Sequence, residues 1–245
     1  MMKRILNGLI AVFLIGLCAT AMAAEYDGLW FMGFNLNKDV FGNDTGKLVR
    51  QAVNYAVDRD FISSRIIGDL NTPTTVLPPG MDGQDGSIKG YPYDLAKAKA
   101  LMKKAGYSMK DKRLKGLVLL HTDGDKTIKI AKAIKDYLSF IGIGIKLKQM
   151  DYEDQQAWDN ALSSGKHHLF LMGYKAHDAF DGEQKGSRSA SAFLNDLFHS
   201  KGSANFFFLR DEELDSLIDG DRPKEASLRL QEDPVTVNLF YITVL

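Results

Sequence analysis

The histidines are the residues most able to do chemistry in this chain, and their spacing decides which chemistry is open to them. His167 and His168 are adjacent, so on a strand their rings face opposite sides of the sheet and cannot bind one metal ion together. His177, Asp178 and Asp181 form a tighter group of possible ligands. Three such ligands in one loop, without cysteine, are weak evidence for a metal site. We therefore expect no bound metal and no cofactor.

Motifs of known enzymes are missing from the sequence. The glycine pair of GIGIKL follows an expected helix and enters a strand, the reverse of the order that directs backbone amides at a dinucleotide. There is no Walker loop, no HExxH pair and no GxSxG elbow. The acidic loops at 82–86 and 123–126 lack the pattern of a calcium loop, so we expect ordinary turns there. No carboxylate is tied by spacing to a base or nucleophile, so we predict no catalytic residue and no enzyme.

The composition is that of an ordinary globular protein with balanced charge. Of 245 residues, 45% are hydrophobic and 25% are charged, which disfavours collagen-like, disordered and coiled-coil chains. Lysine and arginine total 31, as do aspartate and glutamate, so the chain lacks the basic surface that nucleic acid requires. We therefore expect no nucleic-acid partner.

Residues 1–23 have the pattern of a cleaved export signal. A positive start is followed by an apolar run over 5–19, and Ala21-Met22-Ala23 has the small residues that signal peptidase requires. The alternative is a retained membrane anchor, but this run is shorter than the roughly 20 residues that a spanning helix needs. We predict cleavage after Ala23 and an exported, periplasmic protein. The only cysteine, Cys18, lies within this segment, so residues 24–245 can form no disulfide.

Strands alternate with helices along residues 24–245, which predicts an α/β fold with a largely parallel sheet. Asp94 is a suitable N-cap for the helix that follows it, and Gly106 is suited to end that helix. The proline- and glycine-rich stretch 71–90 is an expected loop, and 61–67 an expected turn. Expected strands are 29–36, 117–120, 143–147, 168–173, 205–209 and 235–244. Expected helices lie around 49–56, 95–105, 126–141, 151–162, 190–198, 212–218 and 223–230.

Several blocks of sequence, in order, carry a family resemblance. They include FNLNKDVFGNDTGKLVRQAVNYAVDRDFI at 34–62, YPYDLAKAKALMKKAGY at 91–107, NDLFHSKGSANFFFLRDEELDSLID at 195–219 and EDPVTVNLFYI at 232–242. The chain resembles the second lobe of the family-five extracellular solute-binding proteins, the dipeptide- and oligopeptide-binding components of ABC importers. The resemblance implies a type II periplasmic-binding-protein-like lobe, with a mixed, mostly parallel sheet flanked by helices. It also implies peptide or similar solute binding and an ABC transporter permease as partner.

The resemblance also implies a site. Peptide-binding relatives have a Gly-Trp-x-Ala-Asp motif in the cleft, whose aspartate pairs with the peptide α-ammonium group. The matching text here runs from Gly173 to Asp178. Tyr174 takes the place of the tryptophan, and the aspartate falls on His177 unless one inserted residue makes Asp178 the equivalent. A neutral histidine would not supply the negative charge. The substrate-binding candidates are therefore Tyr174, His177 and Asp178.

Members of the family are two-lobed clamshells of about twice this length. We expect residues 24–245 to be a single second lobe without the N-terminal lobe, so that the site must be closed by self-association or by a separate lobe. A truncated solute-binding protein for ABC import is the favoured function. An exported protein-interaction module and a non-functional relic are the alternatives, because one lobe offers only one wall to a ligand.

Overall fold

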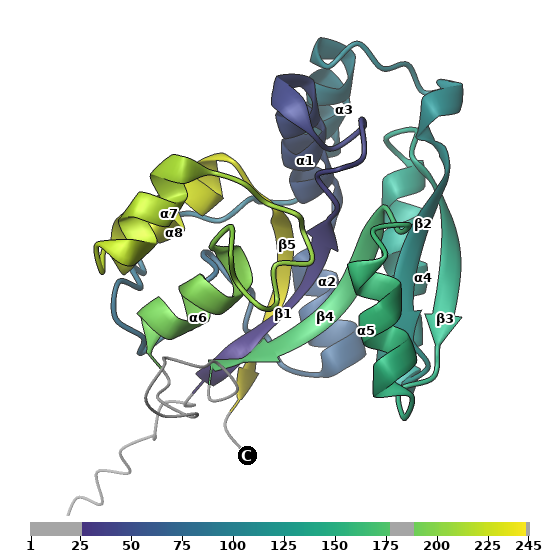
Figure 1. Cartoon of the computed structure of the whole chain (residues 1–245). Helices are drawn as coiled ribbons and strands as arrows, with labels where there is room; N and C mark the ends of the chain where they lie inside the picture. The colour runs from purple at the N-terminus through teal and green to yellow at the C-terminus, as the bar shows by residue number, and fades with distance from the viewer. Residues whose placement is uncertain (1–25, 177–188, 244–245) are drawn as a thin grey trace, which may run out of the picture.

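Five strands form one mixed sheet in the computed structural model, which describes residues 26–176 and 189–243 (Figure 1). The strand order is β3-β2-β4-β1-β5. β2 pairs in parallel with β3 and β4, whereas β1 pairs antiparallel with β4 and β5. Only β1 therefore runs against the other four, which confirms the mixed, mostly parallel α/β fold. The strands are β1 (Tyr26–Phe34), β2 (Lys115–Thr122), β3 (Gly144–Met150), β4 (Leu169–Lys175) and β5 (Thr236–Thr243).

Helices cover both faces of this sheet. α1, α3 and α4 pack on one face, and α5 to α8 lie on the other, where α6, α7 and α8 contact one another (Figure 1). The helices described are α1 (Asn43–Ala56), α2 (Arg59–Phe61), α3 (Leu95–Lys104), α4 (Asp125–Ser139), α5 (Gln155–Ser163), α6 (Ala190–Phe198), α7 (Glu212–Asp219) and α8 (Pro223–Glu232), with a π-helix η1 (Ile62–Ile67) and a 3-10 helix η2 (Lys112–Leu114).

The alternation of β1 divides the core into two clusters. Met32 and Phe34 point toward α1 and α4, whereas Leu29 and Phe31 point toward α5 to α8. A strand sends successive side chains to opposite faces, so a nine-residue strand buried on both faces must be apolar almost throughout. None of the described helices is both long and apolar enough to cross a membrane.

Most expected elements are found, and the misses have local causes. Asp94 caps α3 by accepting a hydrogen bond from the Lys97 amide, and Gly106 has the expected left-handed φ of 78°. α5 begins at Gln155 rather than at 151, because the Asp154 side chain caps it. The expected turn at 61–67 is wrong, since α2 continues into η1 there.

The expected strand at 205–209 is also wrong. Asn205 folds this segment into turns: its side-chain amide donates to the Leu209 carbonyl, and its side-chain oxygen accepts from the Leu209 amide, at 2.9 and 3.0 Å. The three phenylalanines at 206–208 give the segment the composition of a strand. Phe207, however, is wholly buried against Phe31 and Phe170, so the run fills the core as a loop.

Candidate functional site

Three strand ends meet at one edge of the sheet, at the lower end of β1 in Figure 1. The register pairs Gly28 of β1 with Lys175 of β4, and Tyr26 of β1 with Thr243 of β5. The carboxyl ends of β4 and β5 and the amino end of β1 thus lie together. Ligands of α/β proteins gather at the carboxyl ends of parallel strands, so this edge is the candidate ligand-binding site.

Glycine allows β1 and β4 to approach closely at this edge. A Cβ atom at Gly28 would lie 2.2 Å from the carbonyl oxygen of Tyr174, a backbone atom that cannot move without breaking the strand pairing. Two residues back along β4, a Cβ atom at Gly173 would lie 2.5 Å from the indole nitrogen of Trp30. The two glycines therefore hold the strand ends in a fixed register beneath the site.

Tyr174 lies at the end of β4 and turns toward α6. Its hydroxyl donates a short hydrogen bond to Asp196, and its ring packs edge-on against Phe193 at 5.7 Å. Asp196 is only 8% exposed and also accepts a hydrogen bond from the Ser203 amide at 3.2 Å. The hydroxyl of Tyr174 thus links β4, α6 and the loop after it.

The other two candidates, His177 and Asp178, lie outside the described residues. Their roles therefore stay predictions. The chain returns at Ser189, which caps α6, so both residues belong to the connection that leaves the candidate edge after β4. Within the described ranges, no three histidine, cysteine or acidic side chains are grouped to hold a metal ion.

Tyr26 and Tyr241 form a second aromatic group at this edge, which the sequence pattern did not predict. The rings of Tyr26 and Tyr241 are 5.6 Å apart, and the Tyr241 hydroxyl donates to the Thr75 carbonyl at 3.1 Å. Asn71 exchanges two hydrogen bonds with the Tyr241 backbone, accepting from its amide at 3.1 Å. Burial raises the pKa of Tyr241, so the hydroxyl stays protonated at neutral pH. The 71–90 loop is therefore fastened to the end of β5.

Replacing Tyr174 by phenylalanine tests the link to α6. Loss of the hydroxyl leaves a buried carboxylate oxygen of Asp196 without this donor, so we expect the free energy of unfolding to fall by about 1–3 kcal/mol. Tyr152→Phe is the matched control, because Tyr152 is 62% exposed. Urea unfolding of both variants measures the difference. Equal stability of the two variants would contradict the assigned hydrogen bond.

Comparison with known proteins decides the family. The profile of the bacterial extracellular solute-binding proteins, family 5 (middle region), matches residues 20–186. The chain belongs to this family. The match begins before β1 and extends past the end of β4, so it includes the parts of the candidate edge that β1 and β4 form. Family 5 consists of extracellular solute-binding proteins rather than enzymes.

Relatives of this family-5 chain bind several kinds of solute. A probable deoxycholate-binding periplasmic protein of Escherichia coli is 29% identical over 77% of this chain and 33% of its own length. A glutathione-binding protein of Salmonella choleraesuis is 27% identical over 76% of this chain and 35% of its own length. A heme-binding protein of Haemophilus influenzae is 40% identical over 31% of this chain and 14% of its own length. This chain thus spans about a third or less of these relatives.

Solved structures show the same fold. The oligopeptide-binding protein AppA of Bacillus subtilis, in complex with a nonapeptide, matches with a TM-score of 0.72 and 20% identity, over 89% of this chain and 45% of its own. DppA of Helicobacter pylori, in complex with the peptide STSA, matches with a TM-score of 0.74 and 23% identity, over 90% of this chain and 43% of its own. The family-5 chain therefore has the fold of just under half of each of these proteins.

Proposed function

We propose that this chain provides one wall of a periplasmic solute-binding site that serves an ABC importer, with a small peptide as the favoured solute. The observation that supports this most is the family match through 186, which includes the end of β4 and the 177–186 connection. The similarity of the chain's fold to two proteins solved in complex with peptides supports a peptide as the solute. Relatives that bind glutathione and, by name, deoxycholate point to other small solutes as the alternatives.

The proposal includes a second wall from outside this lobe. A tight small-molecule site buries roughly 70–90% of its ligand, and one open sheet edge cannot do this. A ligand held on one side also loses its freedom of motion while making only part of the contacts. We therefore propose that a separate lobe or a second copy of the chain closes over the β4 edge, and that an ABC permease receives the solute. Residues 1–23 would be removed on export.

Within this site, Asp178 is proposed to pair with the α-ammonium group of the peptide. Carboxylate and ammonium form a charge-assisted hydrogen bond, which is stronger than a neutral one. His177 is the alternative ligand-facing residue, and Tyr174 would form the adjacent side wall. Because Tyr174 already donates its hydroxyl proton to Asp196, its proposed contact with solute is through the ring.

Substitution of Asp178 gives the direct test. We expect di- to pentapeptides with a free amino terminus to raise the melting temperature of residues 24–245, and N-acetylated versions to raise it less. Asp178→Asn should weaken peptide binding about 10- to 100-fold, as measured by calorimetry, because a charged hydrogen bond contributes about 1.5–3 kcal/mol. His177→Asn is the matched control and should leave binding unchanged.

Two other results would change the proposal. Loss of binding in His177→Asn alone would place the ligand-facing residue one position earlier. Absence of any peptide effect, in a protein that forms concentration-dependent dimers by light scattering, would contradict peptide binding and favour an interaction module.

A further inference from the structure

Arg59 is a buried cation without a counter-ion. It is the first residue of α2 and is 5% exposed, and its Nη1 atom donates to the carbonyl and side-chain oxygens of Asn54 at 3.1 and 3.3 Å. Among the residues that the structure describes, no carboxylate lies within ion-pair distance of Arg59, and its Nε and Nη2 atoms make no hydrogen bond. A buried charge in a folded protein is ordinarily paired, so this guanidinium is an exception.

The free nitrogens of Arg59 are reached by solvent. In the described part of the chain, the fully enclosed side-chain atoms without a partner belong to His167 and Ser227 only. The Nε and Nη2 atoms of Arg59 are not among them, although the residue as a whole is buried. They therefore keep some accessible surface of their own.

Arg59 lines a cavity of about 390 Å³ beside α2 and the 71–93 segment. Arg59 also lines a smaller cavity on the side of Thr236 and Asn238. The larger cavity is wide enough for a small molecule, and its walls are mostly apolar. They include Pro73, Ile88, Tyr91, Pro92 and Tyr93.

The acidic residues at the cavity have other partners. Asp58 accepts a hydrogen bond from the Phe61 amide at 2.9 Å, as the cap of α2. Asp60 accepts one from the Thr72 hydroxyl at 2.5 Å. Burial lowers the pKa of Arg59 to about 10 and outweighs the charges of Asp60 and Asp58, which raise it. The guanidinium is still protonated at neutral pH and remains available to an anion.

We propose that this cavity binds a small carboxylic acid with a flat apolar body, its carboxylate held by the Nε and Nη2 atoms of Arg59. These two nitrogens are parallel donors whose spacing matches the two oxygens of a carboxylate. Tyr91, which is held in place by a hydrogen bond from its hydroxyl to the Gln231 carbonyl at 2.7 Å, and Tyr93 offer aromatic faces to the body of the ligand. None of these residues belongs to the β4 edge, so the proposal does not depend on peptide binding.

Benzoate and benzamide are the probes that test it, since they share a ring and differ in charge. We expect saturation-transfer NMR and thermal shift on residues 24–245 to show benzoate binding at least fivefold tighter than benzamide. Tyr93→Ala, at a position 44% exposed, should weaken benzoate binding at least threefold. Tyr152→Ala, at a position 62% exposed and outside the cavity, should have no effect.

Arg59→Met removes the charge and should abolish the preference for benzoate over benzamide in protein that circular dichroism shows to be folded. If this variant does not fold, the paired tyrosine variants decide the question. Equal binding of the two probes to the wild-type protein, no benzoate binding at all, or equal effects of Tyr93→Ala and Tyr152→Ala would each overturn the proposal.

Discussion

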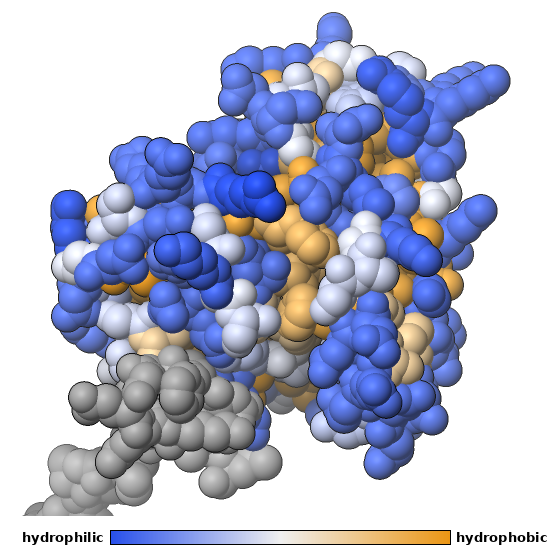
Figure 2. Space-filling view, viewed as in Figure 1, coloured by the Kyte–Doolittle hydropathy of each residue, from blue (hydrophilic) through white to orange (hydrophobic). Residues whose placement is uncertain are grey.

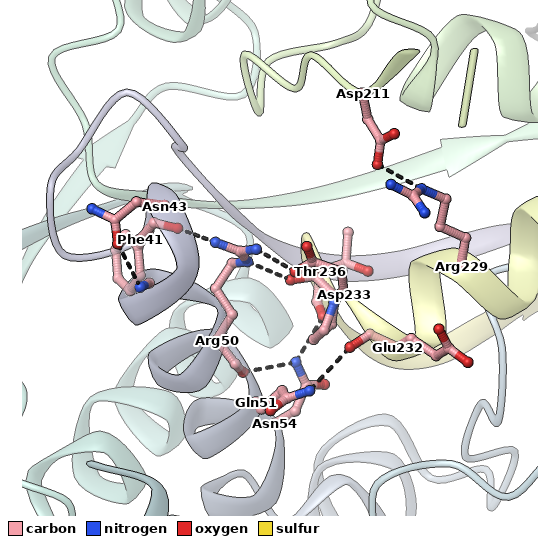
Figure 3. A network of polar contacts seen from close by, with 12 residues as sticks. Phe41, Asn43, Arg50, Gln51, Asn54, Asp211, Arg229, Glu232, Asp233 and Thr236 are labelled. Atoms are coloured by element: carbon pink, nitrogen blue, oxygen red, sulfur yellow. Dashed lines mark hydrogen bonds and ion pairs between the residues drawn. The ribbon is translucent and has the colours of Figure 1, made fainter. Parts of the chain in front are cut away.

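Replacing Arg50 by alanine is expected to lower the free energy of unfolding by about 2–4 kcal/mol, since it removes two buried hydrogen bonds and a partly exposed ion pair. Arg50 lies on α1 and is 4% exposed. Its Nε atom donates to the Pro234 carbonyl at 2.8 Å, and its two Nη atoms donate short hydrogen bonds to the Phe41 carbonyl and to Asp233 (Figure 3). Alanine would leave both carbonyls without this partner inside the protein.

The Arg50 contacts are part of a longer junction between α1 and the segment that leads into β5. Gln51 donates to the Glu232 carbonyl and Asn54 to the Thr236 carbonyl, each at 3.0 Å (Figure 3). Three side chains of α1 therefore bind the backbone of residues more than 180 positions later in the chain. Because β5 begins within this junction, loss of Arg50 should weaken the docking of the last strand on β1.

Urea unfolding measures this effect, and the chain offers matched controls. Arg65→Ala removes an exposed arginine on η1 and should change stability by less than about 0.5 kcal/mol. Asp233→Asn should cost less than Arg50→Ala, because the Asp233 side chain is 39% exposed and can be solvated. A loss below about 1 kcal/mol for Arg50→Ala would show that the ion pair contributes little beyond its desolvation cost.

The sequence predicted the helix that carries Arg50 but not the direction of its side chain. Val49, Val53 and Ala56 form the apolar stripe of α1 as expected, and all three are fully buried. Arg50 and Asn54 lie outside this stripe and are buried as well. Their partners come from residues 233–236, and a periodic pattern within one helix contains no information about so distant a segment.

The candidate site also depends on contacts between distant segments, which a local sequence pattern does not predict. The apolar run at 168–173 predicted the strand that carries Tyr174, and the family resemblance indicated Tyr174 and the residues after it. That Tyr174 would donate to Asp196 depends on how α6 packs against β4, which propensity does not specify. The pairing of Tyr241 with Thr75 and Asn71 likewise joins two segments whose contact only the tertiary fold creates.

The second large effect is expected in acid, where protonation of His167 should destabilise the folded protein. His167 is 1% exposed, and its ring packs edge-on against Phe170 at 5.4 Å and beside Phe208 at 6.4 Å. Among the described residues, neither ring nitrogen has a hydrogen-bond partner of normal geometry. Burial is the main cause that lowers the pKa of His167 to about 4. The backbone of Ala161 opposes this shift, and the charge of Lys38 adds to it.

Protonation of His167 favours the unfolded chain over the folded one. An unfolded histidine has a pKa near 6.5, so between pH 6.5 and pH 4 the unfolded chain binds a proton at this position and the folded chain does not. The neutral buried ring therefore contributes its full stability above pH 6.5, and this is lost as the pH falls toward 4. The difference of about 2.5 pKa units corresponds to about 3 kcal/mol.

Urea unfolding at pH 7.5 and pH 4.5 should reveal this loss, and His167→Phe should remove most of it. Phenylalanine keeps a flat ring beside Phe170 but cannot be protonated, so its stability should depend less on pH even if the packing costs some stability at pH 7.5. His168→Gln should remove a smaller part, since the pKa of His168 is also lowered by burial but its ring is less buried. If the His167→Phe variant lost as much stability in acid as the wild-type protein, the proton responsible would bind elsewhere, and the carboxylates with lowered pKa, such as Asp211 beside Arg229, would be the next groups to substitute.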